Sequence, residues 1–327
     1  MPKVTSILVV RLSAIGDLIL VAPITAQLAK EGHSVTVLCK DAYRSVASCL
    51  PGVEAVLSWE KDRAGIKAQV FTFDQVLDLH GTSKSKRWCG QLKLPVRTYK
   101  KPYLRRALLL LTKQNSMALS PVVHRYAAAA APFFSGGFRP ESVDYQLRMP
   151  KVHIELPEQP YIALVLGGSY KGKRLDFQAW RQIMDGLSVF QMPLALIGGP
   201  EEAGMGESLE QPLGSGAKNY CGTTTVIEGF KVIENAALVI SGDTGFMHAA
   251  ANFNRPLISL WGATHPSLGF APWPVYDKQR AVVTTSALSP LSKHGKVPWW
   301  MPNPIRKLPL DKVISAVGSI LQDKTTL

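Results

Sequence analysis

The sequence has few cysteines and no long apolar run. Its four cysteines form no C-x-x-C pair and have no partnering histidine cluster. This spacing is that of neither a zinc site nor a disulfide framework, so we expect buried, reduced thiols. The apolar run at 107–111 falls far short of the roughly 18–20 residues that a membrane span needs. The apolar stretch before Arg11 is too short for a signal-peptide core, and we expect a soluble cytoplasmic protein.

Acidic residues are missing from one long stretch of the chain. None occurs between Asp78 and Glu141, although the whole sequence carries a formal net charge of +13. The stretch holds twelve cations: Lys84, Lys86, Arg87, Lys93, Arg97, Lys100, Lys101, Arg105, Arg106, Lys113, Arg125 and Arg139. A block of one sign concentrates anions such as nucleic acid, phosphorylated lipid or an anionic membrane face. A solvated basic face without a partner is the alternative.

What the sequence does contain is typical of an α/β protein. At 327 residues, 46% of them hydrophobic, it is long enough for two domains. Apolar runs typical of buried strands alternate with helical patterns, which predicts parallel sheets covered on both faces. Strand-like runs lie at 6–12, 34–39, 54–59 and 74–79, and again at 161–166, 193–198, 237–242 and 256–262. Helical patterns lie at 18–32, 84–93, 176–190, 201–210, 225–235 and 245–252.

The Pro-rich stretch 150–160 is the best linker between the two series. We expect an amino-terminal domain over 1–155 and a carboxy-terminal domain over 156–327, with a final helix at 308–322 that packs back on the first domain. Two such sheets place a cleft between them, and ligands bind at the carboxyl ends of the strands.

The first strand runs into RLSAIGD, which places Asp17 at the start of a helix. A carboxylate there can serve as a general base for an attacking hydroxyl. Alternatively, the carboxylate only stabilises the helix through a favourable interaction with the helix dipole. No G-x-G-x-x-G occurs at this turn, which disfavours a dinucleotide-dependent oxidoreductase.

The stretch GGSYKGKR after the strand at 161–166 resembles part of a phosphate-binding P-loop. Gly167, Gly172 and Lys173 fit G-x-x-x-x-G-K, but Arg174 stands where the motif needs a Ser or Thr hydroxyl for magnesium. A nucleotide hydrolase is therefore disfavoured, and a different phosphate site is the alternative.

Three further strand ends carry polar residues. The segment VISGDTGFMHAAA places Asp243, Thr244, Gly245 and His248 where a helix begins, and the free N–H groups of a helix start bind anions. The segment IGGPEE offers Glu201 and Glu202, either as a helix start or as a carboxylate for the hydroxyls of a ribose. Thr264 and His265, after the strand at 256–262, are interpreted as a wall of the same site.

Together these segments resemble the family of ADP-heptose:lipopolysaccharide heptosyltransferases, which are inverting glycosyltransferases of the two-domain GT-B fold. The resemblance spans almost the whole chain and is carried by RLSAIGDLILVAPI, LVLGGSYKGKRLDFQAW, LIGGPEE, and the segment from VISGDTG to WGATHPS. It implies a donor, ADP-L-glycero-D-manno-heptose, and an acceptor hydroxyl in the phosphorylated lipopolysaccharide inner core, without a metal or other cofactor.

The resemblance also implies residue roles. Asp17 matches the family's general base. Residues matching the donor site are Lys173, Glu202, Asp243, Thr244, Gly245 and His248. Two departures are that Leu175 and Asp176 replace the Trp-Pro of many relatives, and that 288–304 lacks the cysteines that relatives often carry there.

The basic block then has a use in acceptor binding. Lys84, Lys86 and Arg87 directly follow the strand at 74–79, and we expect them to bind acceptor phosphates or to dock the protein on the cytoplasmic face of the inner membrane; Arg105 and Arg106 are weaker candidates. No D-x-D pair occurs, as expected for a metal-independent transferase. The rival interpretations are a GT-B glycosyltransferase that uses another nucleotide sugar and a non-enzymatic anion or nucleic-acid binder; we expect no nucleic-acid partner.

Overall fold

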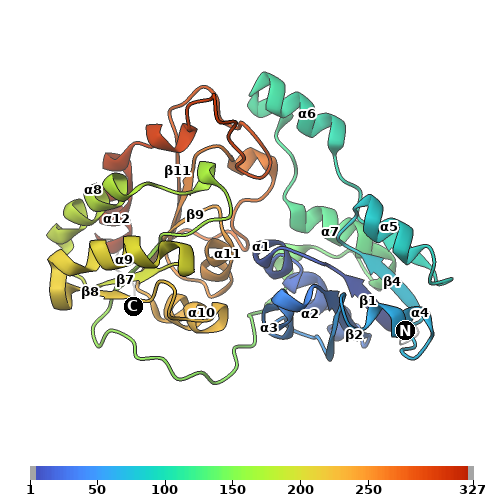
Figure 1. Cartoon of the computed structure of the whole chain (residues 1–327). Coiled ribbons are helices and arrows are strands. Elements are labelled where there is room, and N and C mark those ends of the chain that lie inside the picture. Colours follow the sequence, from blue (N-terminus) through green and yellow to red (C-terminus); the bar gives the residue numbers. More distant parts are fainter. Residues whose placement is uncertain (1–4, 323–327) are drawn as a thin grey trace. The chain divides into compact units, whose positions relative to one another are not determined.

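The computed structural model describes residues 5–322, so the first four and last five residues of the two expected domains lie outside it. The chain forms two compact units. The first contains the chain up to Tyr103 together with 120–150, and the second contains 104–119 together with the chain from Lys151 onward. Each unit has its own parallel sheet (Figure 1).

The first unit is built on a five-stranded sheet in the order β3-β2-β1-β4-β5. Every neighbouring pair is parallel. The central strands are apolar and buried on both faces, which is why their sequences read as continuous apolar runs. The strands are β1 (Ser6–Val10), β2 (Ser34–Cys39), β3 (Ala55–Ser58), β4 (Gln75–Asp78) and β5 (Val96–Thr98).

Helices cover both faces of this sheet. On one face α4 (Arg63–Lys67) and α5 (Ser83–Cys89) pack in a core that includes Trp59 and Trp88. The helices α2 (Ala22–Lys30), α3 (Arg44–Ser48) and α7 (Val122–Ala130) belong to the other face. The helix expected at 18–32 is two helices, α1 (Ile15–Ile19) and α2, because Pro23 lacks an N–H group and suits the first turn of a new helix.

The second unit is built on a six-stranded parallel sheet in the order β11-β10-β9-β6-β7-β8. Counted along the chain from β6, this is the order 6-5-4-1-2-3 of a doubly wound dinucleotide-binding sheet. The strands are β6 (Ile162–Val165), β7 (Leu194–Ile197), β8 (Ala217–Asn219), β9 (Leu238–Gly242), β10 (Leu257–Trp261) and β11 (Gln279–Val283). The predicted fold of two Rossmann-like α/β domains is confirmed.

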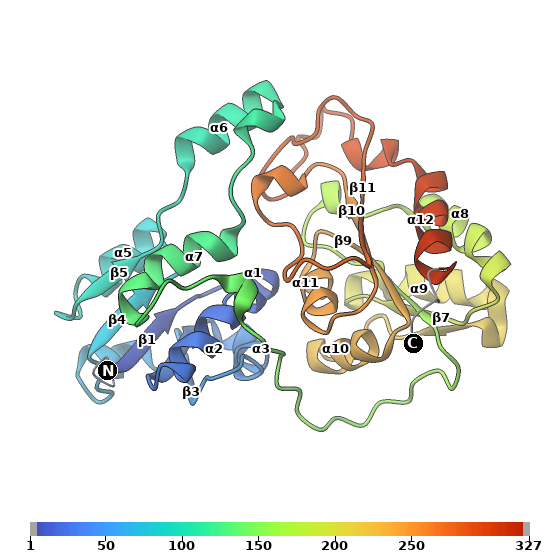
Figure 2. The same ribbon diagram turned by 180° about the vertical axis from the view of Figure 1, so that it is seen from behind.

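The helices of the second unit lie on opposite faces of its sheet (Figures 1 and 2). One face carries α8 (Phe177–Leu187), α9 (Ala203–Glu210) and α12 (Leu310–Gln322), and the other carries α10 (Val226–Asn235) and α11 (Gly245–Asn252). The apolar residues of α12 are buried against α8, β10 and β11. These contacts account for the apolar face of α12 within its own unit, and packing of the final helix on the amino-terminal domain stays a prediction.

One helix belongs to a different unit from its neighbours in the sequence. The helix α6 (Tyr103–Thr112) precedes α7 of the first unit, yet residues 104–119 are grouped with the second. Extended segments lead into and out of α6 (Figure 2). Across residues 5–322, no helix combines the length and apolar character that crossing a membrane would require.

Candidate active site

The strand order of the second sheet creates a switch point between β6 and β9. These two strands are adjacent and parallel, while the chain leaves β6 toward β7 and leaves β9 toward β10. Loops at the carboxyl ends of such strands separate and leave room for a ligand. The loop after β6 carries Lys173 and the loop after β9 carries Asp243.

These two residues form an ion pair. Lys173 Nζ lies 2.8 Å from Asp243 Oδ2, and the side chains are 15% and 9% exposed. Glycines allow the close approach: a Cβ on Gly242 would lie 2.5 Å from the carbonyl oxygen of Lys173, and one on Gly295 would lie 2.7 Å from Lys173 Cγ. The structure thus brings together two residues from distant segments that the sequence assigned to one site.

Helix α11 begins directly beside this pair. Thr244 is its N-cap, and Thr244 Oγ1 accepts a hydrogen bond from the Met247 N–H at 3.4 Å and lies 3.0 Å from Ser241 Oγ. Gly245 is the first helical residue and is half-buried, whereas His248 is buried. The N–H groups of the first turn and the positive end of the helix dipole suit an anion at this position.

Arg174, which stands where a P-loop has a hydroxyl, holds two glutamates. Its Nη1 lies 3.2 Å from Glu202 Oε1 and 3.0 Å from Glu201 Oε2. The side chain of Glu202 is 8% exposed and accepts a hydrogen bond from the Gly199 N–H at 2.9 Å, whereas Glu201 is 81% exposed. A Cβ on Gly167 would lie 2.9 Å from Glu202 Oε2. Glu202 is therefore buried against the loop after β6, whereas Glu201 contacts Arg174 of this loop from an exposed position.

The loop after β10 borders the Lys173 loop, because the Ala263 N–H donates to the Gly172 carbonyl at 2.9 Å. Thr264 is 1% exposed, and its hydroxyl has no hydrogen-bond partner among the described residues. His265 caps a short 3₁₀ helix: its Nδ1 accepts from the Ser267 N–H at 3.1 Å, and burial lowers its pKa. Thr264 and His265 thus lie on a loop that contacts the Lys173 loop, and their role as a wall of the site stays a prediction.

In the first unit, Asp17 is paired with a buried arginine. Asp17 lies in the first turn of α1, its side chain is 25% exposed, and its carboxylate forms an ion pair with Arg11. Arg11 Nη1 also donates to the Leu79 carbonyl at 2.8 Å and to the Tyr126 hydroxyl at 2.7 Å. Burial opposes the charged guanidinium, but Asp17, Tyr126 and Tyr99 outweigh it, and the pKa of Arg11 is raised.

The sequence interpretation missed Arg11 and Tyr126 as partners of Asp17. Arg11 directly follows β1, where a cation at the end of an apolar strand was a visible signal. Nothing local to Tyr126, which lies on α7, indicated its contact with Arg11, because the two residues meet only through the fold.

The three cations expected to bind acceptor lie on α5. The Thr82 side chain caps this helix in a capping box with Ser85, and the Ser85 hydroxyl donates to Asp78 Oδ2 at 2.9 Å. Lys84, Lys86 and Arg87 are exposed, and Lys84 Nζ lies 5.4 Å from the centre of the Trp59 ring. The cations Arg105 and Arg106, expected in the first domain, are grouped with the second unit because α6 packs there.

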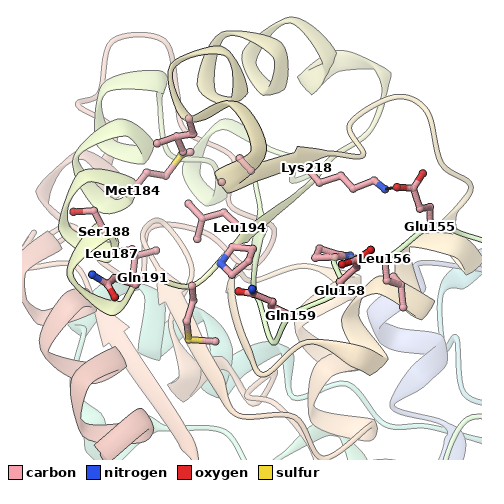
Figure 3. A pocket seen from close by; sticks show the side chains of 16 residues that line it. Glu155, Leu156, Glu158, Gln159, Met184, Leu187, Ser188, Gln191, Leu194 and Lys218 are labelled. Atoms are coloured by element: carbon pink, nitrogen blue, oxygen red, sulfur yellow. Dashed lines mark ion pairs between the residues drawn. The ribbon is translucent and has the colours of Figure 1, made fainter.

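A cavity of about 870 Å³ lies elsewhere in the second unit (Figure 3). It is lined by the linker residues 155–159, the end of α8 and the starts of β7 and β8. Lys218 Nζ and Glu155 Oε1 form an ion pair at its rim, 2.6 Å apart. The cavity lies at the amino ends of the strands, so it is distinct from the site at the carboxyl ends.

Comparison with known proteins agrees with this architecture. "Lipooligosaccharide heptosyltransferase 2" of Haemophilus influenzae is 28% identical over 188 residues, which are 51% of this chain and 53% of that protein. The matched part thus spans about half the length of this curated relative.

Two solved structures share the fold. The E. coli ADP-heptose lipopolysaccharide heptosyltransferase II is 18% identical, covers 98% of this chain and 99% of its own, and superposes with a TM-score of 0.69. An E. coli heptosyltransferase solved with ADP is 18% identical, covers 96% and 99%, and has a TM-score of 0.68.

The fold defines a two-domain protein of the GT-B class. The family model described as "Glycosyltransferase family 9 (heptosyltransferase)" matches residues 66–296, which is more than half of the chain. The chain therefore belongs to glycosyltransferase family 9, and the family resemblance drawn from the sequence motifs is confirmed.

Proposed function

We propose that this protein is an inverting glycosyltransferase that transfers a heptose from ADP-L-glycero-D-manno-heptose to a hydroxyl of the lipopolysaccharide inner core. The observation that carries the proposal is the Lys173–Asp243 pair beside the start of α11, at the switch point of the second sheet. Its family membership and a structural neighbour solved with ADP support the choice of donor.

In this proposal the donor diphosphate lies between Lys173 and the first turn of α11. The ammonium and the N–H groups near Thr244 and Gly245 stabilise the negative charge that grows on the leaving diphosphate. Glu202 accepts hydrogen bonds from the ribose hydroxyls, and Asp243 holds Lys173 in place. His248 supports the donor loop from within α11.

Asp17 acts as the general base. Its carboxylate accepts the proton of the acceptor hydroxyl while that oxygen bonds to the anomeric carbon and the bond from this carbon to the diphosphate breaks. A single displacement inverts the anomeric centre. Since Asp17 and the donor site are on different units, the proposal requires domain closure in the reactive state.

The proposed reaction needs no metal, and it uses a basic surface for the acceptor. Lys173 and the start of α11 supply the positive charge that a bound divalent metal provides in other transferases, and we expect turnover without added metal. The exposed cations Lys84, Lys86 and Arg87 bind phosphates of the acceptor. The reaction then takes place on the cytoplasmic face of the inner membrane, without a nucleic-acid partner.

A thermal-shift and calorimetric comparison of ADP, UDP and GDP tests the donor assignment. We expect ADP to stabilise the protein most, and Lys173→Met to weaken ADP binding by about tenfold or more, since hydrogen bonds to charged groups contribute about 1.5–3 kcal/mol. The matched control is Lys171→Met, since the exposed Lys171 lies on the same loop. Stabilisation by UDP but not by ADP would replace the donor with another nucleotide sugar.

A further inference from the structure

Helix α6 is anchored to the second unit by one of its faces. Leu109 is fully buried in a cluster with Leu119 and Leu268, and Leu110 packs against the same cluster. At the end of the helix, Lys113 Nζ donates to the carbonyl of Pro290. The Leu119 N–H donates to the Ser267 carbonyl at 2.8 Å. These contacts fix which face of α6 is turned inward.

The opposite face presents leucines to solvent. Leu104 is 75% exposed, Leu108 is 38% exposed and Leu111 is 80% exposed. Positions i, i+4 and i+7 lie on one stripe of a helix. Soluble monomers rarely expose contiguous apolar patches unless these mark an interaction site.

An arginine lies beside this stripe, and α6 carries no acidic residue. Arg105 is exposed and its guanidinium donates to the carbonyls of Met117 at 3.4 Å and Ser116 at 3.3 Å, which holds it beside the helix. Lys100 and Lys101 precede the helix and Arg106 lies on it, within the stretch 79–140 that contains no Asp or Glu. An amphipathic helix with leucines on one face and cations but no acids nearby is the pattern of an interfacial membrane helix.

A second exposed apolar element lies in the second unit. Trp299 and Trp300 are 90% and 67% exposed, with ring centres 5.6 Å apart. The segments on either side of these tryptophans contact the loop after β6: a Cβ on Gly172 would lie 2.9 Å from Val297 Cγ2, and Asn303 Nδ2 donates to the Lys171 carbonyl at 2.9 Å. Residues 278–310, which include this loop, contain no acid. Tryptophan is enriched at membrane–water interfaces.

We propose that the outer face of α6 is a docking surface for an anionic lipid bilayer, with the exposed Trp299–Trp300 loop of the same unit as a second apolar contact. The leucines and tryptophans insert into the headgroup boundary, and the cations bind lipid phosphates. A nucleic acid fits less well, because its phosphate backbone would leave the leucine stripe exposed to water. The proposal rests on surface chemistry and does not depend on the transfer reaction.

Co-sedimentation of the full-length protein with vesicles tests this surface. One set of vesicles contains phosphatidylglycerol and phosphatidylcholine, and the other contains phosphatidylcholine alone. We expect binding to the anionic vesicles, weakened by salt, and little binding to the neutral ones. Replacing the two most exposed leucines of this face, as in Leu104→Ser with Leu111→Ser, should weaken binding by about tenfold or more.

The matched control removes two exposed apolar residues elsewhere in the same unit. Val189 is 73% exposed and Val275 is 71% exposed, and Val189→Ser with Val275→Ser should bind the vesicles as the wild type does. Thermal unfolding confirms that both variants fold, and ADP binding should be unchanged in both.

Three results would overturn the proposal: no binding to anionic vesicles, equal loss in the two double variants, or unaltered binding in the leucine variant. A salt-sensitive affinity for duplex DNA that exceeds vesicle binding would assign the surface to nucleic acid. None of these results bears on nucleotide binding, so failure of the docking proposal is distinguishable from failure of the proposed function.

Discussion

Lys173 Nζ lies 2.8 Å from Asp243 Oδ2, and this contact joins the loops that follow β6 and β9. Both side chains are largely withdrawn from water. The pair holds the ammonium at the switch point, and in the proposed reaction little reorganisation would be needed for it to contact a diphosphate.

Variants of Lys173 and Asp243 should separate the effect of the ion pair on folding stability from its effect on ADP binding. Lys173→Met leaves the Asp243 carboxylate without its ion-pair partner and should lower the free energy of unfolding by about 1.5–3 kcal/mol. The double variant Lys173→Met with Asp243→Asn removes the stranded charge and should recover most of this loss, but not ADP binding. Denaturant unfolding and calorimetry of the single and double variants measure both effects. Recovery of ADP binding in the double variant would contradict a role of Lys173 in holding phosphate.

The two adjacent glutamates form a natural pair for a second test. Glu202 is buried against the loop after β6, whereas Glu201 is exposed, although Arg174 contacts both. Glu202→Gln should weaken ADP binding by about tenfold and leave inorganic pyrophosphate binding unchanged, because pyrophosphate has no ribose. Glu201→Gln serves as the control and should change neither. If both variants lose pyrophosphate affinity, the glutamates act on the phosphate loop instead.

Reversing the charges on α5 tests acceptor binding. A triple variant carrying Lys84→Glu, Lys86→Glu and Arg87→Glu should raise the KM for a phosphorylated acceptor by about tenfold or more at low salt, and less as salt screens exposed charges. The KM for the donor should not change, since the proposed donor site is on the other unit.

The control variant for α5 reverses the charges of Lys30 and Lys67, which are exposed on other helices of the first unit. An unchanged acceptor KM in the triple variant, or an equal rise in the control, would remove α5 from the acceptor site.

The cap formed by His265 predicts a pH dependence of stability. Burial lowers the pKa of His265, and its neutral Nδ1 accepts a hydrogen bond from the Ser267 N–H. A lowered folded-state pKa means that the unfolded chain binds the proton more readily. The contribution is therefore present above the unfolded pKa of about 6.5 and is lost as the pH falls below it.

His265→Asn retains a capping acceptor that does not titrate. Its melting temperature should therefore decline less than that of the wild type between neutral and mildly acidic pH. Parallel declines in the two proteins would assign the acid sensitivity to other groups.

The sequence predicted the central strands well because they are buried on both faces. Runs such as 34–39 and 237–242 coincide closely with β2 and β9. The strands β5, β8 and β11 were missed, because they lie at the sheet edges and are short or polar, as in Ala217–Asn219. Edge strands gain their pairing from the neighbouring strand and need no apolar run of their own.

Motifs placed the site residues on loops, but they could not show which side chains meet. The Lys173–Asp243 contact brings together two separately predicted residues. The Arg11–Tyr126 hydrogen bond and the packing of α6 on the second unit depend on contacts between distant segments. Arg174 was identified as a departure from the P-loop pattern, and only the structure shows its carboxylate partners.

The departure at Leu175 and Asp176 also has a structural explanation. Leu175 is buried in the core of the second unit, and Asp176 caps α8 by accepting a hydrogen bond from the Ala179 N–H at 3.1 Å. In this chain Asp176 therefore caps the start of α8 without the Trp-Pro of many relatives.

The most direct test of the proposed function is release of ADP from ADP-heptose by the purified protein, with and without a phosphorylated inner-core acceptor. We predict acceptor-dependent release by the wild type, and a loss of about 10²–10⁴-fold in Asp17→Asn, with ADP binding unchanged. The amide can still accept a hydrogen bond from Arg11, so the fold around α1 is retained. Failure of the wild type to release ADP on addition of acceptor would contradict the transfer reaction, and full activity of Asp17→Asn would contradict the role of Asp17 as its base.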